Sequence, residues 1–160
     1  MLEIERQFLV KVALLPDLQN PHAIVQAYLS IEPEVRVRIV DDSAFVTVKS
    51  GGDLARDEYE YAIPIEDARS LMRLSPYSPI EKQRYRLDVD GLVWEIDSYA
   101  GDNAGLWSAE VELSEANQEI KLPAWLGEEI TYDSRFKNRN LAKTPLSQWP
   151  ERESVLRRLA

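Results

Sequence analysis

Hydrophobic and charged residues alternate along most of the chain with a period of two, the pattern of a strand with two unlike faces. In the first ten residues, Glu3, Glu5 and Gln7 alternate with Ile4 and Phe8. The pattern recurs, and we expect about eight strands, over residues 1–10, 24–31, 35–39, 44–50, 56–63, 80–89, 92–99 and 106–113. Short turns join most of them, which favours an antiparallel barrel or sandwich.

Helical spacing is clearest at residues 65–74, where Ile65, Ala68, Leu71 and Met72 predict one amphipathic helix. The second half of the chain is less regular. There we expect short helices at 114–120, with Ser114 as N-cap, at 133–142 and at 151–159, and a turn or helical fragment at 123–127. The expected fold class is therefore mainly β, with a few short peripheral helices.

The polar face of each predicted strand carries one sign of charge, with like charges two residues apart. The acidic positions are Glu3, Glu5, Glu58, Glu60, Glu95, Asp97, Glu110 and Glu112, and the basic ones are Arg36, Arg38, Lys49, Lys82 and Arg84. Like charges held this close repel unless counter-charges lie between them. Either these faces point to water around an apolar sandwich core, or the strands close into a barrel with a charged lumen. Periodicity alone does not choose between the two.

A charged lumen would suit one class of ligand. Carboxylates are the hard oxygen ligands that Mg²⁺ or Mn²⁺ prefers, and Mg²⁺ typically uses one or two of them together with substrate phosphates. Arginine matches phosphate oxygens with two parallel hydrogen bonds, and lysine adds a point charge. A cavity with both kinds of group predicts a metal-bound polyphosphate.

Composition excludes several other kinds of site. The chain has 160 residues, enough for one domain over residues 1–160, and 44% of them are hydrophobic. It contains no cysteine, which excludes disulfides, thiolate zinc sites and a cysteine nucleophile. The single histidine, His22, argues against a multi-histidine metal site and a Ser-His-Asp triad.

Charge and hydropathy limit the classes of molecule that this protein can be expected to bind. A formal net charge of -9 argues against binding nucleic acid or an anionic membrane over the whole surface. No apolar run approaches the roughly 20 residues that span a bilayer, and Glu3 and Glu5 interrupt any signal peptide. We therefore expect a cytoplasmic monomer or homodimer whose partner is a small molecule.

The motifs on these strands follow one another in a specific order. They are Glu3-Ile4-Glu5-Arg6-Gln7, Arg36-Val37-Arg38, Thr47-Val48-Lys49, Glu58-Tyr59-Glu60, Glu81-Lys82-Gln83-Arg84-Tyr85, Trp94-Glu95-Ile96-Asp97, Glu110-Val111-Glu112-Leu113 and Thr131-Tyr132-Asp133-Ser134-Arg135-Phe136-Lys137-Asn138. In this order they resemble the CYTH superfamily, the triphosphate tunnel metalloenzymes, whose signature is ExExK. Each motif alone is weak, but the succession covers nearly the whole chain.

The resemblance implies an eight-stranded antiparallel tunnel, with a few short peripheral and plug helices, that binds a triphosphate with divalent Mg²⁺ or Mn²⁺. It implies metal ligands at Glu3, Glu5, Glu110 and Glu112, assisted by Asp97 and Glu95, and phosphate-binding residues at Arg36, Arg38, Lys49, Lys82, Arg84 and Arg135, which Lys137 joins. Catalysis is expected to rest on Glu5, Gln7, Lys82 and Arg84. Glu58 and Glu60 are expected to position basic side chains or a second metal.

One residue departs from the family pattern: Gln7 stands where ExExK has lysine. Loss of a charge-assisted contact in a poorly solvated site costs on the order of 1.5–3 kcal/mol. The expected function is hydrolysis of inorganic tripolyphosphate to pyrophosphate and phosphate. The alternatives are a class IV adenylate cyclase or thiamine triphosphatase, for which Trp94, Trp107 or Trp125 would have to stack on a base, and a polyphosphate- or nucleotide-binding module with little turnover.

Overall fold

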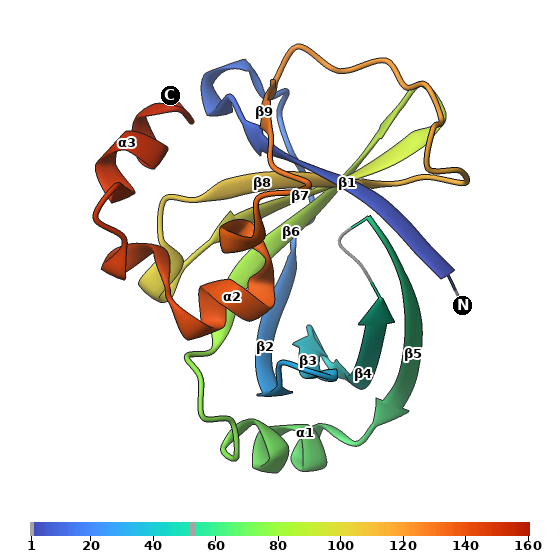
Figure 1. Ribbon diagram of the computed structural model, residues 1–160, viewed down its shortest axis with the longest axis vertical. Coiled ribbons are helices and arrows are strands. Elements are labelled where there is room, and N and C mark those ends of the chain that lie inside the picture. The colour runs from blue at the N-terminus through green and yellow to red at the C-terminus, as the bar shows by residue number, and fades with distance from the viewer. Residues whose placement is uncertain (1, 52–53) are drawn as a thin grey trace.

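The computed structural model describes residues 2–51 and 54–160, and in these residues nine strands form one antiparallel sheet that closes on itself (Figure 1). The strands are β1 (Leu2–Val10), β2 (His22–Ser30), β3 (Glu34–Val40), β4 (Ser43–Gly51), β5 (Ala55–Ile63), β6 (Ile80–Val89), β7 (Leu92–Tyr99), β8 (Trp107–Glu112) and β9 (Leu126–Glu129). Met1, expected in the first strand, lies outside the described residues.

Strand β1 closes the barrel because its two edges have different partners. The sheet order is β5-β4-β3-β2-β6-β7-β8-β1-β9, with a further pairing of β5 to β1. Residues Leu2 to Ile4 pair with β5, Glu5 to Leu9 pair with β8, and Phe8 and Val10 pair with β9. Eight strands therefore make the predicted antiparallel barrel, and β9 is an additional strand.

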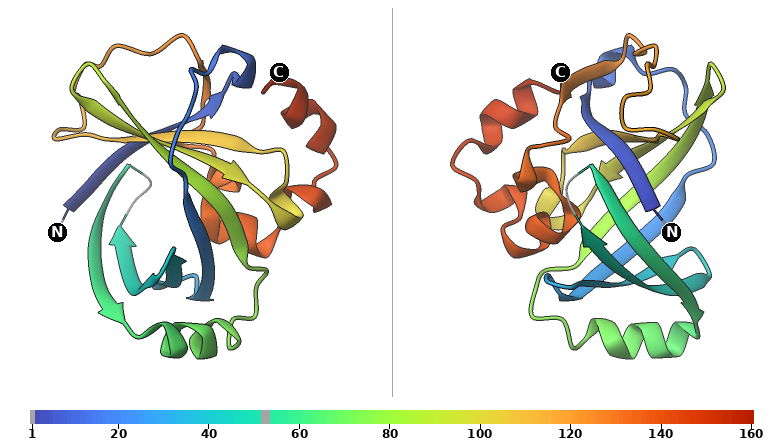
Figure 2. Two further views of the ribbon diagram at one scale, coloured as in Figure 1. Left: turned by 180° about the vertical axis from the view of Figure 1, so that it is seen from behind. Right: turned by 45° about the vertical axis from the view of Figure 1, so that its right-hand side comes forward.

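The helices lie outside the barrel, as Figure 2 shows from two sides. They are α1 (Ile65–Met72), α2 (Asn138–Lys143) and α3 (Arg152–Arg157), with the 3-10 helices η1 (Val12–Leu14), η2 (Gly101–Asn103), η3 (Ser134–Phe136) and η4 (Leu146–Gln148). Helix α1 packs on β2, β3 and β4, and α2 contacts β2 and β6. No helix in the described part of the chain is long and apolar enough to cross a membrane.

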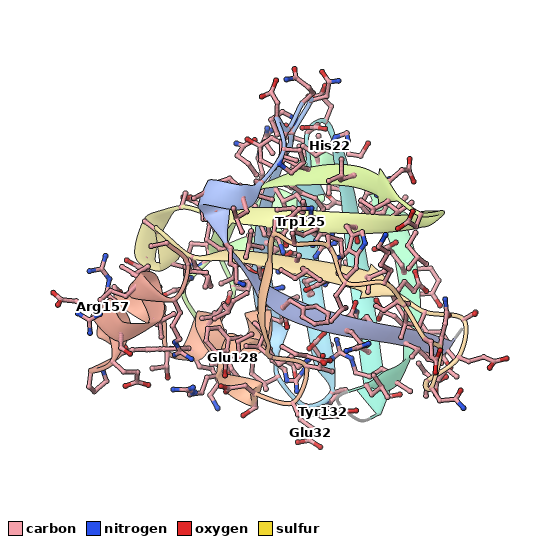
Figure 3. All side chains as sticks on the ribbon, turned by 90° about the horizontal axis from the view of Figure 1, so that it is seen from above. His22, Glu32, Trp125, Glu128, Tyr132 and Arg157 are labelled. Carbon is pink, nitrogen blue, oxygen red and sulfur yellow. The ribbon has the colours of Figure 1, made fainter. Side chains whose placement is uncertain are left out.

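The apolar faces of the strands point outward, where helices and loops cover most of them, although Tyr59 and Tyr61 of β5 are exposed. Ala68 of α1 packs on Val37 and Ala44. Trp94 is fully buried outside the barrel, edge-on to Phe8 at 5.8 Å and to Trp125 at 5.6 Å between ring centres. Trp125 comes from the loop that lies over the strands in Figure 3. The charged faces are therefore inside, so the barrel interpretation is correct and the sandwich is excluded.

Two local expectations in the second half of the chain differ from the structure. Residues 114–120 form turns rather than a helix, because the side-chain oxygen of Gln118 accepts hydrogen bonds from the backbone N–H and the hydroxyl of Ser114. The helix expected at 133–142 divides into η3 and α2 at Lys137, whose backbone is extended with ψ 135°. The turn expected at 123–127 is present at Ala124 and Trp125, where the N–H of Leu126 donates to the Pro123 carbonyl, and it leads into strand β9, whose four residues LGEE carry no alternation.

Candidate functional site

The barrel encloses a cavity of about 240 Å³ whose lining is almost entirely charged or polar. It is lined by Glu3, Glu5, Gln7, Tyr28, Glu34, Arg36, Arg38, Lys49, Arg56, Glu58, Glu60, Arg84, Arg86, Glu95, Glu110, Lys137, Asn138 and Arg139. Two pockets that share lining residues with it adjoin it, one near His22 and one near Glu32. Figure 3 shows these two residues toward opposite edges of the molecule, so the two adjoining pockets lie on opposite sides of the cavity.

Carboxylates gather on one wall of the cavity, on β1 and β8. Gln7 is paired with Glu110 and Glu5 with Glu112 in the register of these strands. The charge of Glu110, burial and the charge of Glu3 together raise the pKa of the Glu5 carboxyl to about 8. Glu3 differs, because its Oε2 accepts a hydrogen bond from Lys49 Nζ at 2.9 Å. The repulsion between Glu5 and Glu110 makes this wall a place where a cation would be stabilised.

This wall fits a divalent metal that takes part of its coordination from a substrate. Among residues 2–51 and 54–160, no group of three histidine, cysteine or carboxylate side chains could hold a metal ion. Glu5 and Glu110 supply two carboxylates, and Mg²⁺ commonly uses one or two carboxylates with phosphate oxygens as further ligands. Glu112 lies farther out, in a rim pocket with Arg86 and Glu95, and burial with the charges of Glu3 and Glu58 raises its pKa.

Most of the basic side chains are held by carboxylates. The contacts are Lys49 to Glu3 at 2.9 Å, Arg56 to Glu34 at 3.1 Å, Arg139 to Glu34 at 3.3 Å, and Arg84 to Asp97 at 2.7 and 2.8 Å and to Glu95 at 3.3 Å. Such pairs fix the direction of each cation but also offset its charge.

Lys82 and Asp97 lie behind the cavity wall and bind each other. Lys82 Nζ donates to Asp97 Oδ2 at 2.8 Å, and neither residue lines the cavity. Burial lowers the pKa of Lys82 to about 8. Burial alone would raise the pKa of Asp97, but Arg84 and Lys82 hold it well below its ordinary value. The structure thus joins these two predicted site residues to Arg84 and leaves both Asp97 oxygens occupied by cations.

Arg36 and Arg38 are held differently, because no carboxylate of the described residues forms an ion pair with either. Arg36 Nη2 donates to Thr47 Oγ1 at 3.3 Å, and Arg38 Nε donates to Gln26 Oε1 at 2.8 Å. Burial and the charges of Arg36 and Arg84 lower the pKa of the Arg38 guanidinium. These two arginines form the part of the cavity that an anion would stabilise most.

Arg135 is the one predicted phosphate-binding residue that lies away from the barrel lumen on the outer surface. It forms ion pairs of 2.7 Å with Asp133 and Glu151, and its guanidinium lies over the rings of Phe136 and Trp149. Its neighbour in sequence, Lys137, does line the cavity. The break between η3 and α2 accounts for the difference, because it turns the two side chains in different directions.

Several cavity residues were not singled out from the sequence. Glu34 shares the strand parity of Arg36 and Arg38, Arg56 that of Glu58 and Glu60, and Arg86 that of Lys82 and Arg84, so counting by two could have found all three. Tyr28 and Arg139 also line the cavity. Neither gave such a signal, since Tyr28 lies in a strand with no charged face and Arg139 comes from α2.

Gln7 is at the centre of the acidic wall. It is 4% exposed, and its backbone is fixed by hydrogen bonds from its N–H to Thr131 Oγ1 and from the N–H of Ile130 to its carbonyl. Its side chain lines the cavity. The uncharged amide therefore faces a region crowded by Glu5 and Glu110.

Comparisons with known proteins agree with this geometry. A family model, the CYTH domain, matches residues 1–144. An inorganic triphosphatase of Acetivibrio thermocellus is 37% identical over 153 residues, which cover 93% of this chain and 98% of the relative. An inorganic triphosphatase of Nitrosomonas europaea is 41% identical over 150 residues, 89% of this chain and 97% of the relative.

Solved structures share the fold. One of an inorganic triphosphatase superposes with a TM-score of 0.66 at 35% identity and covers 88% of this chain and 93% of that one. One of a Pyrococcus horikoshii protein has a TM-score of 0.54 at 17% identity, over 72% of this chain and 80% of that one. The second comparison concerns the fold alone.

Proposed function

Because this chain belongs to the CYTH domain family, we propose that its cavity binds a linear triphosphate with Mg²⁺ or Mn²⁺ and hydrolyses it. The proposed substrate is inorganic tripolyphosphate, cleaved to pyrophosphate and phosphate. One observation carries the proposal. The same cavity contains two arginines, Arg36 and Arg38, that form no ion pair with a described carboxylate, and two carboxylates, Glu5 and Glu110, that repel each other. The relatives named inorganic triphosphatase support the same substrate.

In this proposal each wall has its own role. Arg36 and Arg38 bind phosphate oxygens, and Arg84, held in place by Asp97 and Glu95, adds a third guanidinium. Glu5 and Glu110 would hold the metal, which when bound would supply charge neutralisation of the phosphates and an activated water. Catalysis then depends on positioning and charge stabilisation around the transferred phosphoryl group.

The remaining predicted residues receive indirect roles. Lys82 and Asp97 support Arg84 from behind the wall. Glu3 orients Lys49, and Glu112 contributes negative charge at the rim. Arg135 stabilises the segment before α2 rather than touching substrate.

An organic substrate has less support. The cavity lining offers almost no apolar surface on which a base or a thiazole ring could pack. Trp94 and Trp125 are buried in the outer core, and Trp107 stacks on Tyr85 at 6.3 Å outside the lumen. We therefore favour tripolyphosphate hydrolysis over adenylate cyclase or thiamine triphosphatase activity.

One observation favours a second candidate, a polyphosphate-binding module with little turnover. Gln7 puts a neutral amide on the wall where the family signature has a lysine. Without that charge the cavity still holds an anion through Arg36 and Arg38, but stabilisation of the transition state falls.

Phosphate release tests both candidates. The wild-type protein and Gln7→Lys are assayed with tripolyphosphate, ATP and thiamine triphosphate, each with Mg²⁺ and with Mn²⁺. We expect turnover of tripolyphosphate and a rate about ten- to a hundredfold higher for Gln7→Lys. Gln83→Lys adds the same charge at an exposed position of β6 and should leave the rate unchanged. Absence of hydrolysis in every case would reject the enzyme and leave the binding module.

A further inference from the structure

The cavity holds its cations in two chemically different ways. Carboxylates hold Lys49, Arg56 and Arg84, whereas uncharged side chains hold Arg36 and Arg38. A carboxylate in place of either uncharged partner would form a direct ion pair with the arginine and offset its charge. The use of uncharged partners at these two positions therefore calls for a functional reason.

Gln26 is the uncharged partner of Arg38. It lies on β2 directly opposite Arg38 in the register of β2 and β3, and it is fully buried. Its Oε1 accepts from Arg38 Nε at 2.8 Å, and its Nε2 donates to the Tyr28 hydroxyl at 3.3 Å. The contact occupies only the Nε of Arg38, so both terminal nitrogens of the guanidinium can serve a ligand.

Thr47 has the same relation to Arg36. It is fully buried on β4, paired with Arg36 on one side and Glu60 on the other. Its hydroxyl donates its single hydrogen to Glu60 Oε1 at 3.0 Å, and its oxygen accepts from Arg36 Nη2 at 3.3 Å. The Nε of Arg36 is buried without a hydrogen-bond partner among the described residues. Thr47 therefore lies between Glu60 and Arg36 and is hydrogen-bonded to both, so that the two charged side chains do not bind each other directly.

We propose that Gln26 and Thr47 are positioning residues, which fix Arg38 and Arg36 for a phosphate chain without forming a direct ion pair with them. The inference rests on the proposed function, because it assigns these two residues to the anion-binding side of the same cavity. It accounts for an amide and a hydroxyl at positions where an acid would form an ion pair with the arginine. It also predicts that the affinity of the cavity for a highly charged anion depends on residues that never touch the anion.

The decisive variant is Gln26→Glu, which keeps the shape of the side chain and adds one charge. We expect the KM and the calorimetric Kd for tripolyphosphate to rise about ten- to a hundredfold while kcat changes much less. The thermal midpoint should stay equal or rise, because the introduced carboxylate would pair with Arg38. Gln83→Glu makes the same chemical change at an exposed position of β6 and should alter neither quantity.

Thr47 is tested by the pair Thr47→Ser and Thr47→Val. The serine keeps the hydroxyl and should retain the wild-type KM, whereas the valine should raise it. If serine and valine give the same KM, or if Gln26→Glu lowers the thermal midpoint with its Kd unchanged, the two residues are only structural and the inference fails.

The same measurements separate this inference from the proposed function. If the wild-type protein binds tripolyphosphate without hydrolysing it, the hydrolase proposal fails, and the Kd values still decide the positioning role. If the wild-type protein does not bind tripolyphosphate at all, both are rejected.

Discussion

Asp97 is a buried carboxylate that two buried cations share. It is 1% exposed and accepts hydrogen bonds from Lys82 and from two nitrogens of Arg84. Removing one partner of a buried ion pair leaves an uncompensated charge, which costs about 3–5 kcal/mol. In this site, the loss of Asp97 would leave Lys82 without its carboxylate partner, while Arg84 would keep the 3.3 Å contact to Glu95.

We therefore expect Asp97→Asn to lower the free energy of unfolding by at least about 3 kcal/mol at pH 7. The folded-state pKa of Asp97 lies below its ordinary value, so its contribution is present above about pH 4 and is lost as the pH falls through about 4 and lower. Urea unfolding at a series of pH values from neutral into the acid range measures both effects.

The variant should show a smaller loss of stability on acidification than the wild type. Asp88→Asn removes an exposed carboxylate from the neighbouring strand β6 and serves as the control, with an expected change within about 0.5 kcal/mol. An Asp97→Asn protein as stable as this control would contradict the assignment.

At the residue scale, the sequence indicates which side chains share one face of a strand, but not which of them are in contact. Strand parity places Lys82, Arg84 and Asp97 on the charged faces of their strands, and the structure shows that these faces point into the barrel. Strand parity contains no information on how far a side chain lies from the cavity, so it cannot show that Lys82 and Asp97 lie behind the residues that line it. Contacts such as Gln26 to Arg38 depend on the register between strands that no single strand's pattern specifies.

Helix α1 illustrates how the elements outside the barrel contribute to it. Ala68 is fully buried against Val37 and Ala44, on the outer side of the strands that carry Arg36 and Arg38 inside. The small side chain sets how closely the helix approaches β3 and β4. This packing supports the wall without touching the cavity.

Ala68→Leu should therefore destabilise the protein by about 1–3 kcal/mol through overpacking. Ser70→Leu makes a comparable addition on the exposed side of the same helix and should change the free energy of unfolding by less than about 0.5 kcal/mol. Urea unfolding of the two variants compares them directly. Equal losses would mean that helix propensity or solubility, rather than packing, is responsible.

The type of each element could be predicted wherever the alternation of apolar and charged residues was long. The prediction failed where tertiary contacts determine the local structure. All eight long alternating segments are strands. Strand β9 forms because it continues along the edge of β1 after β5 departs at Ile4, and Gly127 allows an approach in which a Cβ would lie 3.2 Å from the Leu9 carbonyl oxygen. No feature of a four-residue segment shows this from sequence.

Over the whole molecule, the opposed charges of the cavity predict linked binding of metal and anion. The metal relieves the repulsion between Glu5 and Glu110, and the anion relieves that among the arginines. A ligand at about a hundredfold its Kd stabilises the folded state by ~2.7 kcal/mol, which for a chain of this size is a shift in thermal midpoint of about 5–11 °C.

We expect tripolyphosphate with Mg²⁺ or Mn²⁺ to give a larger midpoint shift than the sum of the shifts with either alone. A chelator should abolish the excess. Differential scanning fluorimetry with metal, tripolyphosphate and both provides the measurement, with sulfate as a control anion. A shift with tripolyphosphate that is insensitive to the chelator would contradict a shared site.

Because the apolar faces of the strands point outward, the interior and the outer layer of this protein have exchanged their usual roles. In most small domains the interior is the part that tolerates mutation least, whereas here the interior is the reactive surface and the hydrophobic packing lies in an outer shell under helices and loops. Residues of the lumen can therefore diversify in charge without rebuilding that shell. A lineage of such barrels can change the anions it accepts while its architecture stays the same.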